Sequence, residues 1–159
     1  MRTWKDLKHT LLNGRWPHQP LLIGLDFDGT LSPLVHKPAL ARLPADIRRL
    51  LRRLARGSGI GVAIVSGRSL EDITARVGMR GIYYSGNHGL EIRSPRAVWR
   101  HPKTAKASRD IRRLNGILSP ALKSFPGTLI ENKGPTLSIH YRGTASGKTA
   151  ANTCGITSF

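Results

Sequence analysis

Two aspartates stand two residues apart where a short apolar segment gives way to a Gly-Thr turn. Asp26 and Asp28 follow the apolar run Leu21–Leu25, which begins after Pro20. An apolar run bounded by a proline and a glycine turn predicts a β-strand that is buried on both faces, with Asp26 where the strand leaves the sheet. Because ligands of open parallel α/β sheets bind outside such carboxyl ends, this pair is typical of a phosphate-handling site.

The two carboxylates suit phosphoryl transfer. A carboxylate fixed at a strand end can attack phosphorus to form an acyl phosphate, and a second carboxylate two positions on can protonate the leaving oxygen. We therefore predict Asp26 as the nucleophile and Asp28 as the general acid and base. Two carboxylates repel a phosphate dianion, so we expect Mg²⁺ as a cofactor, held by Asp26 and by Asp28, the latter through its backbone carbonyl.

A second polar turn follows the apolar segment Ile60–Val65. Its residues Ser66, Gly67 and Arg68 precede a predicted helix capped by Ser69. The Ser66 hydroxyl and the following amides, at the positive end of that helix, are predicted donors to phosphate oxygens. Taken alone, the aspartate pair also fits helix-capping acids in a strand-end turn, and the second turn makes that alternative much weaker.

Strands and helices alternate along the first half of the chain. This alternation predicts an α/β fold with a parallel sheet and right-handed crossovers, so that the ends of the first two strands lie side by side. The expected elements are a helix at 3–13, a strand at 21–25, a helix from Pro44 to about Arg56, a strand at 60–65, a helix from Ser69, a strand at 82–85, an extended segment at 90–99, a helix at 103–118, and strands at 128–131 and 136–141.

Composition places the chain among ordinary globular proteins. Its 159 residues are 39% hydrophobic and 22% charged, enough for a domain with a core. The apolar runs are too short to cross a bilayer, and the start of the chain has no apolar stretch typical of a signal peptide. A single cysteine, Cys154, closes no internal disulfide. We therefore expect a cytoplasmic protein with no membrane partner.

The chain is strongly basic, with a net charge of +17 and a pI near 11.5. Such values meet the usual screen for nucleic-acid binding. However, five arginines between positions 48 and 56 alternate with apolar residues, as on the solvated face of an amphipathic helix. Neither a zinc pattern nor an aromatic-basic RNA signature accompanies the charge, so we expect no nucleic-acid partner and some attraction of anionic metabolites.

Four further candidate functional residues lie beyond the second turn. His88 and His140 have no partner at metal-ligand spacing, and a structural hydrogen bond and a ligand contact are equally open for each. Glu131 and Lys133 alternate along one face of a predicted strand, where a surface ion pair is the plain interpretation.

These motifs, taken in order, resemble the trehalose-6-phosphate phosphatases of the haloacid dehalogenase superfamily. Asp-Phe-Asp-Gly-Thr-Leu (26–31) and Val-Ser-Gly-Arg (65–68) are shared by much of the superfamily. Gly-Asn-His-Gly-Leu-Glu (86–91), Glu-Asn-Lys-Gly (131–134) and Ile-His-Tyr-Arg (139–142) indicate the trehalose branch. The resemblance covers about Leu21 to Arg142.

The resemblance implies a haloacid-dehalogenase-like Rossmannoid parallel sheet, here partial, followed by the beginning of an α/β cap domain. We expect a lead-in at 1–20, the N-terminal part of the core at 21–93, a partial cap at 94–142 and an irregular tail at 143–159. It also implies a magnesium-dependent hydrolase of trehalose biosynthesis that converts trehalose 6-phosphate to trehalose and phosphate through an aspartyl phosphate.

The resemblance implies roles for single residues. Asp26 is the phosphorylated nucleophile, Asp28 the general acid and base, and Ser66 a phosphate ligand. On the cap, Glu131 and Lys133 hold sugar hydroxyls, which overrides the interpretation as a surface ion pair. The remaining expected substrate-proximal residues are His88, His140 and Arg142.

The chain departs from the family after Arg142. Family members continue through the rest of the cap to a lysine and then a Gly-Asp-Asp motif that completes the magnesium site, and this chain ends before either. We do not equate Lys148 with that lysine. We therefore expect a phosphatase truncated or frameshifted after Arg142, with little or no turnover.

Two alternatives stay open. One is a phosphatase of the same superfamily that acts on another sugar phosphate, such as sucrose phosphate or a phosphorylated glyceryl glycoside. The other is a catalytically silent interaction or regulatory module, whose protein partners the sequence does not identify.

Overall fold

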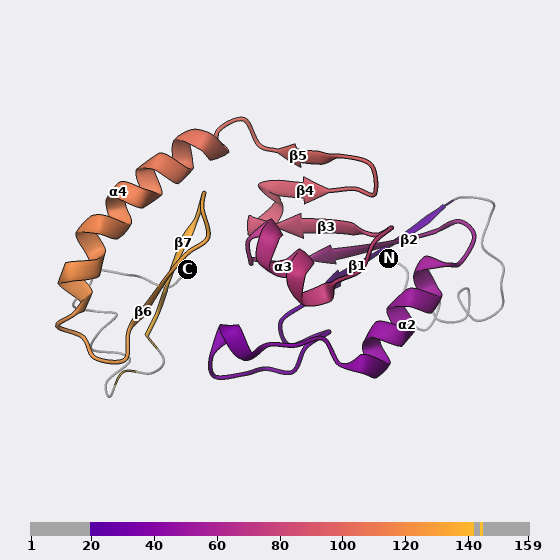
Figure 1. The fold of residues 1–159 in the computed structure, drawn as a ribbon, viewed down its shortest axis with the longest axis horizontal. Coiled ribbons are helices and arrows are strands. Elements are labelled where there is room, and N and C mark those ends of the chain that lie inside the picture. The colour runs from indigo at the N-terminus through magenta and orange to yellow at the C-terminus, as the bar shows by residue number, and fades with distance from the viewer. Residues whose placement is uncertain (1–19, 142–143, 145–159) are drawn as a thin grey trace, which may run out of the picture.

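A five-stranded sheet with two helices, and a long helix with a two-stranded hairpin, form the part of the chain that the structure describes (Figure 1). The structure is a computed structural model and describes residues 20–141 and 144. The expected helix at 3–13, Arg142 and the rest of the tail at 143–159 lie outside these residues. None of the described helices is long and apolar enough to cross a membrane.

Three parallel strands form the first part of the sheet. They are β1 (Leu21–Asp26), β2 (Ile60–Val65) and β3 (Tyr83–Gly86), and the chain crosses between them through α2 (Ala45–Ala55) and α3 (Leu70–Val77). The expected β-α-β-α-β order is confirmed. A short 3₁₀ helix, η1 (Pro38–Leu40), lies between β1 and α2, and a second, η2 (Asn87–Gly89), follows β3.

An antiparallel hairpin extends the sheet beyond β3. Its strands are β4 (Glu91–Arg93) and β5 (Val98–Arg100), which gives the strand order β1-β2-β3-β4-β5. The extended segment expected at 90–99 is therefore confirmed. Because β5 pairs within the same sheet, the sheet runs past residue 93, where we expected the core to end.

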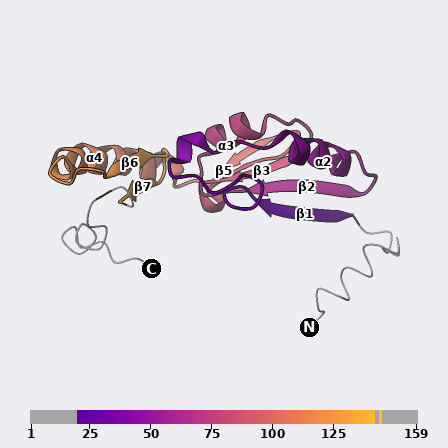
Figure 2. The same ribbon diagram turned by 90° about the horizontal axis from the view of Figure 1, so that it is seen from below.

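Both crossover helices lie on one face of the sheet (Figure 2). Val62, Ile64 and Tyr84 point to that face and are almost completely buried. Right-handed crossovers that step from β1 to β2 to β3 in one direction place every helix on the same side. The prediction that the first strand is buried on both faces is therefore wrong: its side chains alternate, and Leu22 is 62% exposed.

Local signals explain the ends of the two crossover helices. Pro44 precedes α2, as expected, and Asp46 stands in its first turn, where a carboxylate favours the helix dipole. At the start of α3, the Ser69 hydroxyl accepts a hydrogen bond from the Asp72 amide at 3.2 Å, which confirms the expected cap. The helix ends at Gly78, whose φ of 59° is the left-handed conformation common after helices.

The second unit consists of α4 (Thr104–Leu122) and the hairpin of β6 (Leu129–Asn132) and β7 (Leu137–His140). All three elements are expected from the sequence, although α4 runs four residues past its expected end at 118 and includes Pro120. In Figure 1 the hairpin lies beyond the carboxyl ends of the parallel strands. This is the edge where the sequence predicts the site.

Candidate active site

The carboxyl end of β1 holds the two aspartates in a tight turn. Phe27, between them, is completely buried, so its side chain anchors the turn in the core. Its carbonyl oxygen accepts hydrogen bonds from the amides of Leu31 and Ser32 at 3.1 and 2.8 Å. Asp26 is left at the surface, where its Oδ2 lies 3.4 Å from the Thr30 hydroxyl that donates to it. An exposed carboxylate at a strand end is open to a ligand.

The turn after β2 meets the aspartates, as the sequence predicts. Asp26 is in register with Val65, so Ser66, Gly67 and Arg68 follow directly beside the β1 end. Ser66 is almost completely buried, and its Oγ accepts a hydrogen bond from the Arg68 amide at 3.2 Å. The three residues predicted to bind phosphate therefore form one compact turn.

Arg68 links this turn to Asp28. Its Nε and Nη2 donate to the two carboxylate oxygens of Asp28 at 2.9 and 2.7 Å, and its Nη1 donates to Asp72 at 2.8 Å. The guanidinium also lies over the Phe27 ring, 5.6 Å from its centroid. Burial lowers the pKa of Arg68, but hydrogen bonds and charges from Asp28 and Asp72 outweigh burial and raise that pKa above its usual value. Arg68 is therefore a fixed cation beside the aspartates.

His88 packs against the same turn. Its amide donates to the Ser66 carbonyl at 3.2 Å, and a Cβ added at Gly67 would come within 2.6 Å of the His88 ring. Only glycine leaves room for the ring here. The structure thus brings the predicted residues Ser66, Gly67, Arg68 and His88 together.

Asn87 is a site residue that the sequence interpretation missed. It is completely buried, and its Nδ2 donates to Glu91 at 2.7 Å and to the Lys133 carbonyl at 3.1 Å. Its Oδ1 accepts from the Thr136 hydroxyl at 2.7 Å. These bonds hold the β6–β7 turn against the sheet. Asn87 and His88 both have positive φ, which asparagine tolerates better than most residues, so the Gly-Asn-His-Gly pattern carried a signal.

Glu91 is a second missed residue. One of its carboxylate oxygens accepts the Leu70 amide at 3.3 Å, at the start of α3, as well as the Asn87 amide group. The other accepts from Nε of Arg100 at 3.0 Å. Glu91 therefore joins α3, η2 and β5 at the junction with the hairpin.

The hairpin carries the predicted sugar-binding residues as a cluster. His140 Nε2 and Glu131 Oε2 are 2.9 Å apart, and Lys133 Nζ lies 3.7 Å from the same oxygen. The Glu131–Lys133 ion pair therefore exists, and His140 joins it. A carboxylate, an ammonium group and an imidazole that meet at Glu131 Oε2 offer both hydrogen-bond donors and acceptors to a hydroxylated ligand.

The oxygen atoms at the carboxyl end of β1 are of the type that binds a hard cation, but there are few of them. The Asp26 carboxylate and the Asp28 backbone carbonyl are oxygen ligands of the sort that Mg²⁺ prefers. Within residues 20–141 and 144, however, no three histidine, cysteine or acidic side chains gather as a metal group. The residues that the structure describes therefore fit one part of a magnesium coordination shell.

Comparisons with known proteins show which proteins this chain is similar to. A family model described as trehalose-phosphatase matches residues 24–157. A trehalose-phosphate phosphatase of Mycobacterium avium is 39% identical over 135 residues, which are 84% of this chain and 33% of the relative. The chain thus spans about a third of the length of that relative. The match extends past Arg142, where we expected the resemblance to end.

Solved structures share the fold. A trehalose-6-phosphate phosphatase related protein has a TM-score of 0.73 at 24% identity, covering 84% of this chain and 57% of its own. The C-terminal domain of a trehalose-6-phosphate phosphatase from Candida albicans has a TM-score of 0.72 at 24% identity, covering 86% and 47%. The expected α/β fold is confirmed.

Proposed function

The chain belongs to the trehalose-phosphatase family, and we propose that its site hydrolyses trehalose 6-phosphate to trehalose and phosphate, as a cytoplasmic step of trehalose biosynthesis. The observation that supports the proposal is that the turns after β1 and β2 lie side by side. The aspartates after β1 lie beside Ser66 and Arg68 after β2, because Asp26 is in register with Val65. That is the arrangement that nucleophile, acid and phosphate donors require.

The proposed reaction has two steps at Asp26. In the first, an Asp26 oxygen attacks phosphorus, the bond to the sugar oxygen breaks, and Asp28 gives its proton to that oxygen. In the second, Asp28 takes a proton from water, the water oxygen attacks the aspartyl phosphate, and phosphate leaves with Asp26 restored. The Ser66 hydroxyl and the Gly67 amide hold the phosphate oxygens throughout, while the Arg68 amide donates to Ser66 Oγ.

Mg²⁺, held by Asp26 and the Asp28 carbonyl, would supply charge neutralisation between carboxylate and phosphate. Arg68 adds a fixed positive charge next to Asp28. To act as an acid, Asp28 must loosen its two hydrogen bonds to Arg68, which can keep its ion pair with Asp72.

Substrate recognition is assigned to the hairpin. Glu131, Lys133 and His140 lie in one cluster, and we propose that they bind sugar hydroxyls, with Arg142 as a further contact. His88, beside the Ser66 turn, is proposed to face the sugar phosphate. The hydrogen bonds of Asn87 fix the distance between the hairpin and the sheet.

A second candidate is a binding protein without turnover. Both carboxylate oxygens of Asp28 already accept hydrogen bonds from Arg68, so neither is free for proton transfer unless the pair opens. A protein in which the pair stays closed would bind the sugar phosphate and release none of it as phosphate.

Phosphate release from trehalose 6-phosphate in the presence of Mg²⁺ separates the two candidates. Because the described residues supply only part of a magnesium shell, we expect slow turnover in the native chain. We expect a further loss of at least about a thousandfold in Asp26→Asn, as for removal of other enzymatic nucleophiles. Asp46→Asn makes the same chemical change at the start of α2 and serves as the matched control. Saturable binding without release in the native chain would favour the second candidate.

A panel of sugar phosphates determines which substrate the site prefers. Trehalose 6-phosphate, sucrose phosphate and a phosphorylated glyceryl glycoside differ in the sugar that the hairpin must contact. We expect trehalose 6-phosphate to have the highest kcat/KM, and Lys133→Ala to reduce the differences among the three. A higher kcat/KM for sucrose phosphate would reassign the substrate and leave the phosphatase chemistry intact.

A further inference from the structure

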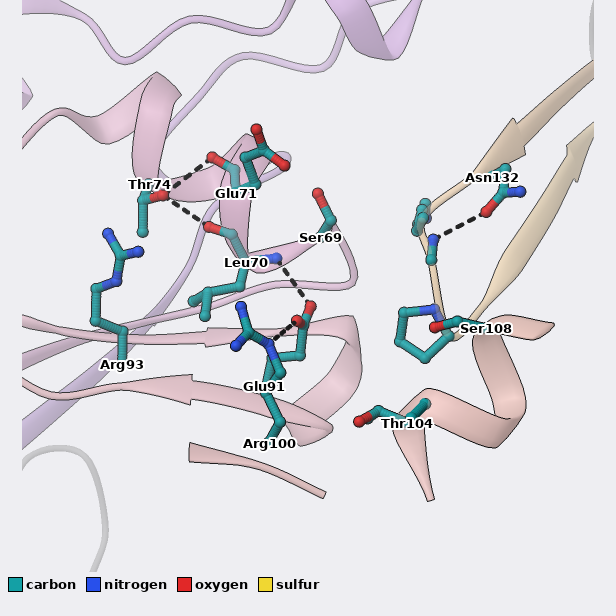
Figure 3. Close-up of a pocket in the computed structure, with 14 residues that line it drawn as sticks. Ser69, Leu70, Glu71, Thr74, Glu91, Arg93, Arg100, Thr104, Ser108 and Asn132 are labelled. Atoms are coloured by element: carbon teal, nitrogen blue, oxygen red, sulfur yellow. Dashed lines mark hydrogen bonds and ion pairs between the residues drawn. The ribbon is translucent and has the colours of Figure 1, made fainter. Parts of the chain in front are cut away.

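A cleft of about 730 Å³ lies between the sheet and the α4–hairpin unit, away from the aspartates (Figure 3). One wall comes from α3, β4 and β5, and the other from α4 and the β6–β7 turn. Asp26, Asp28, Ser66 and His88 are not among its lining residues, whereas Lys133 and Glu91, among the described residues of the candidate site, reach it. The cleft is therefore lined by other residues than those of the proposed phosphate site.

Two arginines stand on the sheet-side wall of the cleft, together with Glu71 and Glu91. Arg93 and Arg100 stand on neighbouring antiparallel strands, and the Arg93 side chain makes no hydrogen bond with any described residue. Arg100 is 61% exposed and uses Nε for Glu91, while its two Nη atoms make no hydrogen bond within residues 20–141 and 144. Guanidinium groups with free donors are suited to a phosphate or carboxylate group.

Among the described residues, the carboxylates of the cleft pair with neither the Arg93 side chain nor the Nη atoms of Arg100. Glu91 is only 12% exposed and its oxygens are occupied by the Leu70 amide, Asn87 and Arg100. Glu71 is the other acidic residue of the lining. Arg93, Arg100 and Lys133 against Glu71 and Glu91 give the lining one formal positive charge, and Lys133 is paired with Glu131 outside the lining, so the anion-binding donors are those of the two arginines.

Hydroxyl and amide groups complete the opposing walls. Figure 3 shows Ser69, the cap of α3, on one side and Thr104, Ser108 and Asn132 on the other, across the open space. Such groups can donate to and accept from the hydroxyls of a ligand. A volume of this size is also typical of small-molecule sites.

We propose that this cleft binds a small polyhydroxylated anion, whose phosphate or carboxylate group is held by Arg93 and Arg100 and whose hydroxyls contact Ser69 and Ser108. The walls belong to both units of the structure. A bound ligand therefore bridges them and holds α4 and the hairpin against the sheet. Binding in this cleft involves neither hydrolysis of the ligand nor contact with Asp26.

Calorimetric titration of the full chain with glucose 6-phosphate tests the proposal. We expect saturable binding at physiological ionic strength, where attraction by the overall charge is screened. Glucose and inorganic phosphate, each lacking one half of the recognised chemistry, are expected to bind at least about tenfold more weakly. Equal affinity for inorganic phosphate, or no saturable binding of glucose 6-phosphate, would overturn the proposal.

Matched variants locate the binding. Arg93→Gln is expected to weaken glucose 6-phosphate binding by about tenfold or more, and Arg96→Gln, on the β4–β5 turn outside the cleft, to leave it unchanged. Circular dichroism confirms that both variants are folded. Equal weakening by the two variants would mean attraction by overall charge and would refute the cleft.

Ser66→Ala separates this site from the proposed phosphate site. We expect Ser66→Ala to leave glucose 6-phosphate binding unchanged while it impairs hydrolysis of trehalose 6-phosphate. If Ser66→Ala abolishes glucose 6-phosphate binding and Arg93→Gln does not, the ligand sits at the proposed active site. That result would refute the cleft and support the proposed function, whereas loss of hydrolysis alone would leave the cleft proposal standing.

Discussion

Replacing Asn87 tests whether one buried amide holds the hairpin against the sheet. Asn87→Ala removes hydrogen bonds to the Glu91 carboxylate, to the Lys133 carbonyl and from the Thr136 hydroxyl. A bond to a charged group contributes about 1.5–3 kcal/mol and a neutral one about 1 kcal/mol, and the effects are less than additive, so we expect a loss of about 3 kcal/mol.

The backbone at this position adds a second effect. Asn87 has a φ of 49°, and alanine in the left-handed region costs about 1 kcal/mol that glycine does not. Asn87→Ala should therefore lower the free energy of unfolding by about 4 kcal/mol and Asn87→Gly by about 3 kcal/mol. Thr136→Val removes one of the three bonds and should cost about 1 kcal/mol.

Chemical denaturation measures these free energies, and hydrogen exchange locates the change. In Asn87→Gly, exchange should accelerate at the turn around Lys133 and Thr136 far more than in β1 and β2. A loss below about 1 kcal/mol in Asn87→Ala, or a loss no larger than that of Thr136→Val, would refute the argument that Asn87 carries this junction.

Three further substitutions test individual contacts of the sheet and of its helix α3. Gly67→Ala forces a Cβ to within 2.6 Å of the His88 ring and should lower the free energy of unfolding by about 1–3 kcal/mol; denaturation that matches the native chain would contradict this contact. Ser69→Ala removes the cap of α3 and should cost about 1 kcal/mol, measured in the same way; no loss would mean that the cap bond is not formed in solution. Burial raises the pKa of the Tyr84 phenol above 10.0, so the neutral phenol stabilises the fold below pH 10, and this stability is lost as pH rises through the raised pKa. Tyr84→Phe should be about 1 kcal/mol less stable at neutral pH, because the hydrogen bonds with Met79 are lost, and its unfolding free energy should fall less steeply above pH 10. An equally steep fall in Tyr84→Phe would assign the pH dependence to other groups.

The local parts of the fold were predictable from the sequence. The cap at Ser69, the helix after Pro44 and the strand pairs 91–100 and 129–140 depend on residues close together in the chain. Periodicity and turn residues determine such elements. The adjacency of Asp26 and Ser66 was also predictable, because right-handed crossovers order consecutive parallel strands.

Contacts between distant residues were not predictable. Arg68 and Asp28 are 40 residues apart, and Asn87 and Thr136 are 49 apart, so no local pattern pairs them. The exposed face of β1 depends on which side of the sheet each helix covers, and an apolar run does not reveal this. The missed residues Asn87 and Glu91 are bonded to each other locally, but their contacts with Lys133, Thr136 and the Leu70 amide join distant parts of the chain.

Detection of phosphorylated Asp26 tests the central claim most directly. The chain is incubated with trehalose 6-phosphate and Mg²⁺, quenched with acid, and digested for mass spectrometry. We predict that the peptide containing Asp26 gains the mass of one phosphoryl group in the native chain and gains none in Asp26→Asn. An unmodified peptide in the native chain, or a phosphorylated one in Asp26→Asn, would contradict the assignment of Asp26 as the nucleophile.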